Sequence, residues 1–233
     1  MAWACKRLFN TGKFGLKAVL FDLDGTLIDS APGLGYAADS MRTRRGMPSL
    51  PVACYRPLAG AGARGMILIA LGQTTASPDY DNLKEEFFLA YEECMLSHCE
   101  LFPEVADMIC GLEQQGLKWG IVTNKSKRFT VPIVDSIKLF SKVQAVVSGD
   151  STAHTKPHPE PLFEAARLLG ISPVDCIYIG DDKRDIDAAK AAGMPGYAAM
   201  WGYLGEHHPQ SWQADIYLKS PGDLLAICAR SIS

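Results

Sequence analysis

Hydrophobic residues along the chain fall into two alternating patterns. Short runs that are apolar at almost every position are typical of strands whose two faces are both buried in a parallel sheet. Five such runs begin at Leu16 (LKAVLFDL), Trp119 (WGIVT), Val143 (VQAVVS), Cys176 (CIYIG) and Gly196 (GYAAM). We therefore expect a parallel strand at each of them.

The segments between these runs carry a helical period. From Pro159 to Gly170 the apolar residues recur on one face, and Gly170 stands where a C-terminal cap is expected. The segment from Asp185 to Ala192, followed by Gly193, repeats this order of strand, helix and glycine. Strands that alternate with helices form right-handed βαβ units, which indicates an α/β fold with a doubly wound parallel sheet.

One long segment departs from this alternation. From about Ala31 to Glu104 the pattern is helical, with apolar residues such as Leu83, Phe87 and Tyr91 at every fourth position, and no strand is predicted. We interpret residues 31–104 as an all-helical cap domain inserted after the first strand. Residues 16–30 and 105–233 then form a discontinuous core domain, and residues 1–15 form an N-terminal extension.

Composition and charge narrow the class of protein. The chain has 233 residues, of which 48% are hydrophobic and 21% are charged, as in an ordinary globular protein. Its 23 Lys and Arg against 26 Asp and Glu give a net charge of -3, which provides no overall field for nucleic acid or a membrane surface. No apolar run is long enough to span a membrane. We expect neither nucleic acid nor membrane as a partner.

The cysteines favour a reducing compartment. There are seven, they are scattered, and no two form a CxxC pair, which argues against a disulfide framework and a zinc knuckle. Cys94, His98 and Cys99 lie close together in sequence, but we interpret them as helix residues rather than metal ligands. A cytoplasmic location is therefore expected.

Polar side chains cluster where the predicted strands end. In an open parallel sheet these ends meet at one edge, where ligands bind. Several carboxylates at one edge repel each other unless a cation lies among them, and a ligand set of oxygen atoms alone favours Mg²⁺. The residues at this edge are Asp22, Asp24, Thr123, Asn124, Lys156, Asp181, Asp182 and Asp185.

This group of residues is suited to phosphoryl transfer. Asp22 can attack phosphorus to form an acyl phosphate, and Asp24 can protonate the leaving oxygen and then deprotonate water. The Thr123 hydroxyl and the Lys156 ammonium group can each bind a phosphate oxygen. The substrate is then a small phosphate ester held in a local site.

The same residues lie in four motifs that resemble those of the haloacid dehalogenase superfamily. The motifs are FDLDGTL, VTN, KPHPEP with Lys156, and GDDKRDI, in this order between Leu16 and about Ala229. The resemblance implies that Asp22 is the phosphorylated nucleophile, Asp24 the acid/base, and Thr123 and Lys156 the phosphate-binding residues. It also implies that Mg²⁺ is bound by the Asp22 carboxylate, the Asp24 carbonyl and Asp181, with Asp185 nearby.

Further similarities point to one branch of the superfamily. A second aspartate in the DxD motif separates its phosphatases and mutases from its dehalogenases. The helical insertion resembles the small cap of the branch that holds phosphoglycolate phosphatases and phosphoglucomutases. GIVTNK, KPHPEPL and WGYLGEHHPQSWQAD are similar to phosphoglycolate phosphatases and N-acetylmuramic acid 6-phosphate phosphatases. Asp182 stands where many phosphoglycolate phosphatases carry Ser, and it is shared with the muramic acid branch.

The remaining residues and functions stay open at this point. Asp182 either belongs to the site or caps the helix that follows. Thr123, Asn124, Lys156 and, from the cap, Arg64 are expected to bind substrate, Arg64 because it follows a glycine-rich turn. We expect a phosphomonoesterase, with phosphoglycolate as the first substrate and N-acetylmuramate 6-phosphate as the second. A sugar phosphomutase and a non-catalytic phospho-receiver are the rival functions.

Overall fold

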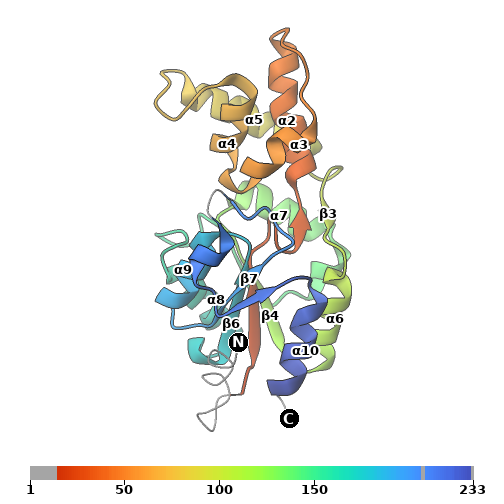
Figure 1. Ribbon diagram of the computed structural model, residues 1–233, viewed down its shortest axis with the longest axis vertical. Helices are drawn as coiled ribbons and strands as arrows, with labels where there is room; N and C mark the ends of the chain where they lie inside the picture. Colours follow the sequence, from red (N-terminus) through yellow and green to blue (C-terminus); the bar gives the residue numbers. More distant parts are fainter. Residues whose placement is uncertain (1–14, 206–207, 232–233) are drawn as a thin grey trace.

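A six-stranded parallel sheet forms the centre of the molecule (Figure 1). The computed structural model describes residues 15–205 and 208–231. The strand order is β5-β4-β1-β6-β7-β8, so that β1 lies between β4 and β6. The strands are β1 (Ala18–Phe21), β4 (Lys118–Val122), β5 (Val146–Val147), β6 (Cys176–Gly180), β7 (Gly196–Ala199) and β8 (Ile216–Leu218).

Both faces of the sheet are buried. Val19 and Phe21 of β1 pack in one apolar cluster with α6 (Val105–Gln114) and α10 (Gly222–Ser231). Ala18 and Leu20 point the other way and pack with α8 (Glu160–Leu169) and α9 (Lys183–Ala191). All four side chains are fully buried, which explains why the strand is apolar at every position. The two helical layers flank the sheet in Figure 1.

The helical insertion lies beyond the carboxyl ends of the strands, at the top of Figure 1. A short antiparallel pair joins it to the sheet, formed by β2 (Ile28–Asp29) and β3 (Glu100–Leu101). The helices of the insertion are α2 (Ala31–Arg44), α3 (Val52–Tyr55), η1 (Arg56–Ala61), α4 (Ala63–Leu71) and α5 (Tyr80–Cys94). The expectation of helices alone from Ala31 to Glu104 was wrong at β3, because two residues are too short to show a strand pattern in sequence.

The other predicted elements are largely confirmed. All five apolar runs contain strands, and the residues Leu83, Phe87 and Tyr91 line the buried face of α5. The sequence did not predict β8, an edge strand of three residues in which Tyr217 is exposed. The helix expected from Asp185 to Ala192 begins earlier, at Lys183, because Asp182 caps it. α7 (Lys127–Ser136) follows β4.

Two further observations concern membrane-spanning helices and the expected N-terminal extension. No helix in the described ranges is long and apolar enough to cross a membrane. The expected N-terminal extension, residues 1–15, lies outside the described residues except for Gly15.

Candidate active site

A cavity of about 310 Å³ lies between the carboxyl ends of the strands and the helical insertion. Asp22 follows β1, Thr123 follows β4 and Asp181 follows β6, so the parallel register brings three distant segments to one edge. The insertion contributes aromatic side chains of α5, including Phe87 and Phe88. The structure thus assembles the polar cluster that the sequence predicts. The predicted site residues that line the cavity are Asp22, Asp24, Thr123, Asn124, Lys156, Asp181, Asp182 and Asp185.

Asp22 is held by one of its two carboxylate oxygens. Its Oδ1 accepts a hydrogen bond from the backbone N–H of Leu23 at 2.7 Å and lies 2.9 Å from Nζ of Lys156. Burial raises the pKa of Asp22 to about 7; Lys156 opposes this shift, and the Asp185 and Asp24 carboxylates add to it. The charged form of Asp22 therefore needs more positive charge than one lysine supplies.

Lys156 is a buried cation that connects two carboxylates. Its Nζ lies 2.8 Å from Oδ1 of Asp185 and donates to the Tyr178 hydroxyl at 2.7 Å. The pKa of Lys156 is raised, because these carboxylates outweigh the effect of burial, which lowers it. Asn124 fixes the lysine backbone with two hydrogen bonds, one from its Nδ2 to the Lys156 carbonyl at 2.9 Å and one to its Oδ1 from the Lys156 N–H at 3.0 Å. The Asn124 amide thus positions Lys156.

Three carboxylates form a group that fits a divalent cation. Ligand oxygens of Asp22, Asp181 and Asp185 all lie within 4.8 Å of one another. Burial raises the pKa of Asp181 well above its usual range, and repulsion from Asp22 and Asp185 adds to the shift. The ammonium group of Lys156 forms ion pairs with two of these three carboxylates, Asp22 and Asp185. A doubly charged ion would balance the excess, and an all-oxygen ligand set fits Mg²⁺.

Asp181 is held by the loop that follows β1 and by the loop that follows β7. Its Oδ1 accepts from Thr26 Oγ1 at 3.3 Å, and its Oδ2 accepts from the Tyr203 N–H at 2.7 Å. Gly25 passes directly over this carboxylate with a φ of +83°, and a Cβ there would lie 2.1 Å from Oδ2 of Asp181. Only glycine allows this approach.

Asp24 is held by Lys125 and Ser30. Its Oδ1 lies 2.9 Å from Nζ of Lys125 and accepts from the Ser30 hydroxyl at 2.5 Å. The Asp24 side chain is thus not part of the group formed by Asp22, Asp181 and Asp185. Lys125 also donates to the Tyr91 hydroxyl at 3.2 Å, and the Thr123 hydroxyl accepts from the Lys125 N–H at 3.1 Å.

Asp182 caps α9. Its carboxylate accepts from the Arg184 N–H at 2.9 Å, while the Asp185 carboxylate accepts from the Asp182 N–H at 3.0 Å, which completes a capping box. The Arg184 side chain pairs with Asp182 and donates to the Gly60 carbonyl of the insertion at 2.8 Å. Asp182 thus has the helix-capping role while also lining the cavity.

The structure does not bring Arg64 to the cavity. Arg64 is exposed on α4 and is not among the cavity-lining residues, where Arg184 stands instead. Arg184 lies inside the GDDKRDI motif, and its place in the first turn of a helix at the sheet edge was the signal that could have revealed it. Lys125 and Tyr203 also line the cavity: Lys125 follows Asn124 and pairs with Asp24, and Tyr203 lies in the loop after β7, where its N–H contacts Asp181.

Most of the chain matches one known protein family. Residues 19–199 match the family described as haloacid dehalogenase-like hydrolase. The chain belongs to this hydrolase family. It is therefore an enzyme, as the resemblance of the four motifs predicted.

Individual relatives cover almost the whole of this hydrolase. A phosphoglycolate phosphatase of Xanthomonas campestris pv. campestris (strain 8004) is 43% identical over 209 residues, which is 89% of this chain and 94% of the relative. An N-acetylmuramic acid 6-phosphate phosphatase of Pseudomonas aeruginosa is 36% identical over 222 residues, covering 93% of this chain and 96% of the relative. The crystal structure of a predicted phosphoglycolate phosphatase from Haemophilus somnus superposes with a TM-score of 0.80 at 26% identity, covering 91% of this chain and 97% of that one.

Proposed function

We propose that this hydrolase is a magnesium-dependent phosphomonoesterase that works through a phosphorylated Asp22. The observation that carries the proposal is the way in which Asp22 is held. Leu23 and Lys156 both bind Oδ1, and no hydrogen bond from the described residues reaches Oδ2. Oδ2 of this cavity-lining residue is therefore available to attack phosphorus.

The reaction has two steps with balanced proton transfers. In the first, Oδ2 of Asp22 forms a bond to phosphorus, the bond from phosphorus to the ester oxygen breaks, and Asp24 gives its proton to the leaving oxygen. In the second, water attacks the acyl phosphate while Asp24 takes up a proton from it, which releases inorganic phosphate and restores Asp22. Lys125 and Ser30, which contact Asp24, hold its carboxylate in place between the two steps.

The phosphoryl group is bound by fixed positive charge and by a hydroxyl group. Lys156, anchored by Asn124, offers its ammonium group, and Thr123 offers its hydroxyl. Asp22, Asp181 and Asp185, with the carbonyl of Asp24, would hold Mg²⁺, which neutralises charge on the phosphoryl oxygens when it is bound.

We further propose that residues 31–104 act as a cap that shields the reaction from bulk water, over a core of residues 16–30 and 105–233. The narrow β2–β3 link and the aromatic face that α5 turns to the cavity support this division. Contacts between the two parts include Arg184 with the Gly60 carbonyl and Arg128 with Glu92.

The proposed substrate is a small phosphorylated acid, with 2-phosphoglycolate first. The identity of 43% to a phosphoglycolate phosphatase supports it, and so does the cation-bearing side chain of Arg184, which suits a carboxylate. N-acetylmuramate 6-phosphate is the second candidate. The aromatic wall of Phe87, Phe88 and Phe129 favours it, because a sugar ring has apolar faces that such a wall can cover. The scattered cysteines support a cytoplasmic location.

The test measures free phosphate released from each of the two esters at matched concentrations, with Mg²⁺ and with a chelator. Asp22→Asn serves as the blank. We expect magnesium-dependent release from one ester in clear preference to the other and none from the blank. A sugar phosphate isomerised without release of phosphate would show a mutase, and a stable phosphoprotein without turnover would show a receiver. Either result would overturn the proposal.

A further inference from the structure

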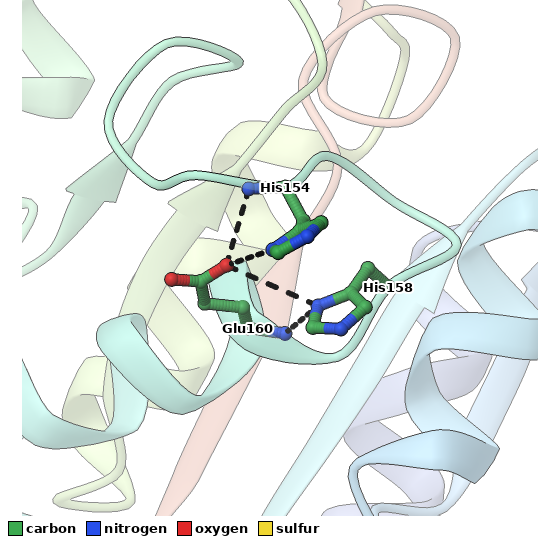
Figure 2. Close-up of side chains that lie close together, drawn as sticks. All are labelled: His154, His158 and Glu160. Carbon is green, nitrogen blue, oxygen red and sulfur yellow. Dashed lines mark hydrogen bonds and ion pairs between the residues drawn. The ribbon is translucent and has the colours of Figure 1, made fainter.

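A second group of potential metal ligands lies outside the cavity, on the segment that joins β5 to α8. It consists of His154, His158 and Glu160, whose ligand atoms all lie within 4.8 Å of one another. Figure 2 shows both imidazole rings turned toward the Glu160 carboxylate. Exposed fractions of 61%, 49% and 37% for the three side chains leave the group open to solvent. None of the three takes part in the proposed phosphatase chemistry.

Backbone contacts hold the group in place. Glu160 is the first residue of α8, and its Oε2 accepts from the His154 N–H at 3.1 Å. The Glu160 N–H in turn donates to Nδ1 of His158 at 3.2 Å. The two rings stack with their centroids 4.2 Å apart and an angle of 25° between their planes. The three side chains are thus brought together by the turn and the helix start, before any ion is added.

The spacing of the ligand atoms suits a four-coordinate ion. Nδ1 of His154 lies 2.7 Å from Oε2 of Glu160, and Nδ1 of His158 lies 4.0 Å from the same oxygen. Ligands about 2.0–2.1 Å from a tetrahedral Zn²⁺ ion are roughly 3.3 Å from one another. The observed separations bracket this value, so that an ion can enter after side-chain shifts of about an ångström that release Nδ1 of His158 from the Glu160 N–H.

We propose that His154, His158 and Glu160 bind a divalent transition-metal ion of the Zn²⁺ type, at a site separate from the magnesium carboxylates. Two imidazoles and one carboxylate favour such an ion, whereas the group of Asp22, Asp181 and Asp185 has oxygen ligands only. Three protein ligands leave a fourth position for water. The described residues thus hold two groups of metal ligands that differ in ligand chemistry.

The position of this site links it to Lys156. His154 and His158 lie two residues before and two residues after this lysine, and Asn124 fixes the lysine backbone between them. An ion bound by both histidines and by Glu160 of α8 closes a ring around this turn. Binding therefore restrains the backbone that carries the phosphate-binding lysine.

The test is Zn²⁺ binding measured by calorimetry on the full chain, with Mg²⁺ in saturating amount and with the cysteines alkylated, so that neither the carboxylate group nor a thiol competes. We expect one Zn²⁺ per chain. His154→Ala and His158→Ala should each weaken binding about tenfold or more, and Glu160→Gln should weaken it as well. His208→Ala, which removes another exposed histidine, is the matched control and should bind as the unaltered chain does.

Amide hydrogen exchange provides a second readout that does not depend on activity. Added Zn²⁺ should slow exchange in residues 154–160 of the unaltered chain and of His208→Ala, but not in the double variant His154→Ala/His158→Ala. The exchange pattern elsewhere also reports whether each variant is folded. Unchanged Zn²⁺ affinity in the double variant, or loss of binding in His208→Ala, would overturn the proposal.

Discussion

The ammonium group of Lys125 forms an ion pair with the carboxylate of Asp24, with 2.9 Å between Nζ and Oδ1. Lys125 follows β4 and Asp24 follows β1, so the pair joins neighbouring strands of the sheet. Lys125 also reaches the Tyr91 hydroxyl of α5 at 3.2 Å. Although burial lowers the pKa of Lys125, Asp24 and Tyr91 raise it overall, so the ammonium group stays charged. This lysine connects the proposed acid/base with the helical insertion.

Lys125→Met should lower kcat by roughly ten- to hundredfold, because Asp24 loses the cation that positions it and proton transfer contributes at least this much to such reactions. The pH profile of kcat should shift together with the rate, since the charge next to the acid/base has changed. Lys127→Ala, which alters an exposed lysine of the same segment, is the control and should keep the rate. An unshifted pH profile with a normal kcat would contradict a positioning role for Lys125.

Gly25→Ala should abolish most of the activity. The new methyl group would lie 2.1 Å from Oδ2 of Asp181, so either the carboxylate or the β1 loop has to move. Gly46→Ala is a matched control, because Gly46 has a similar φ of +70° but no atom within 4 Å of the added Cβ. The control should lose about 1–2 kcal/mol of stability from backbone strain and keep its activity. Steady-state rates and thermal unfolding of both variants separate the effect of backbone strain from the effect of the contact with Asp181.

Variants at Asp182 should separate the helix cap from the ion pair with Arg184. Asp182→Ala removes the acceptor of the Arg184 N–H and should cost about 1 kcal/mol of unfolding free energy. Asp182→Ser retains a capping oxygen and should recover most of that loss, although it lacks the charge that pairs with Arg184. Denaturant unfolding measures the loss of the helix cap. A KM raised in both variants would show the loss of the ion pair with Arg184. A serine variant as unstable as the alanine variant would refute the capping role.

Asp39 should stabilise the folded protein at neutral pH and lose this effect at acidic pH. Burial favours its neutral form, but hydrogen bonds from the Leu50 N–H, Ser49 and Tyr55 outweigh burial, and its pKa lies below 3.8. A carboxyl group with a lowered folded pKa stabilises the protein above its unfolded pKa, and this contribution is lost as the pH falls through the folded pKa. Asp39→Ala should therefore cost about 1–2 kcal/mol at neutral pH.

The check is unfolding by denaturant across a pH series. The difference between the unaltered chain and Asp39→Ala should shrink as the pH falls below about 4. Asp135→Ala, at an exposed position of α7, should show no such dependence. A difference that stays constant with pH would mean that the charge of Asp39 contributes nothing.

The core of the fold was readable from local patterns. β1 and β6 are apolar at every position because helices cover both of their faces, and that burial leaves a direct mark on the sequence. β3 and β8 were missed, since two or three residues at an edge carry no periodic signal. In the same way the expected helical insertion was confirmed, while the strand that links it to the core was not predicted.

The sequence by itself determined which polar residues gather at the site. Asp22, Thr123, Lys156 and Asp181 each follow a predicted strand or stand in a motif, and the parallel sheet has only one edge at which they can meet. That conclusion rests on which residues follow each predicted strand, and it needs no side-chain geometry.

Only the tertiary structure decided which neighbours these residues have. Arg64 and Arg184 are equally basic in sequence, yet Arg184 lines the cavity and contacts Gly60 of η1, whereas Arg64 is exposed on α4. Asp24 pairs with Lys125, and this contact joins the segments that follow two neighbouring strands. Contacts between segments far apart in the chain depend on how whole elements pack, and no local pattern encodes them.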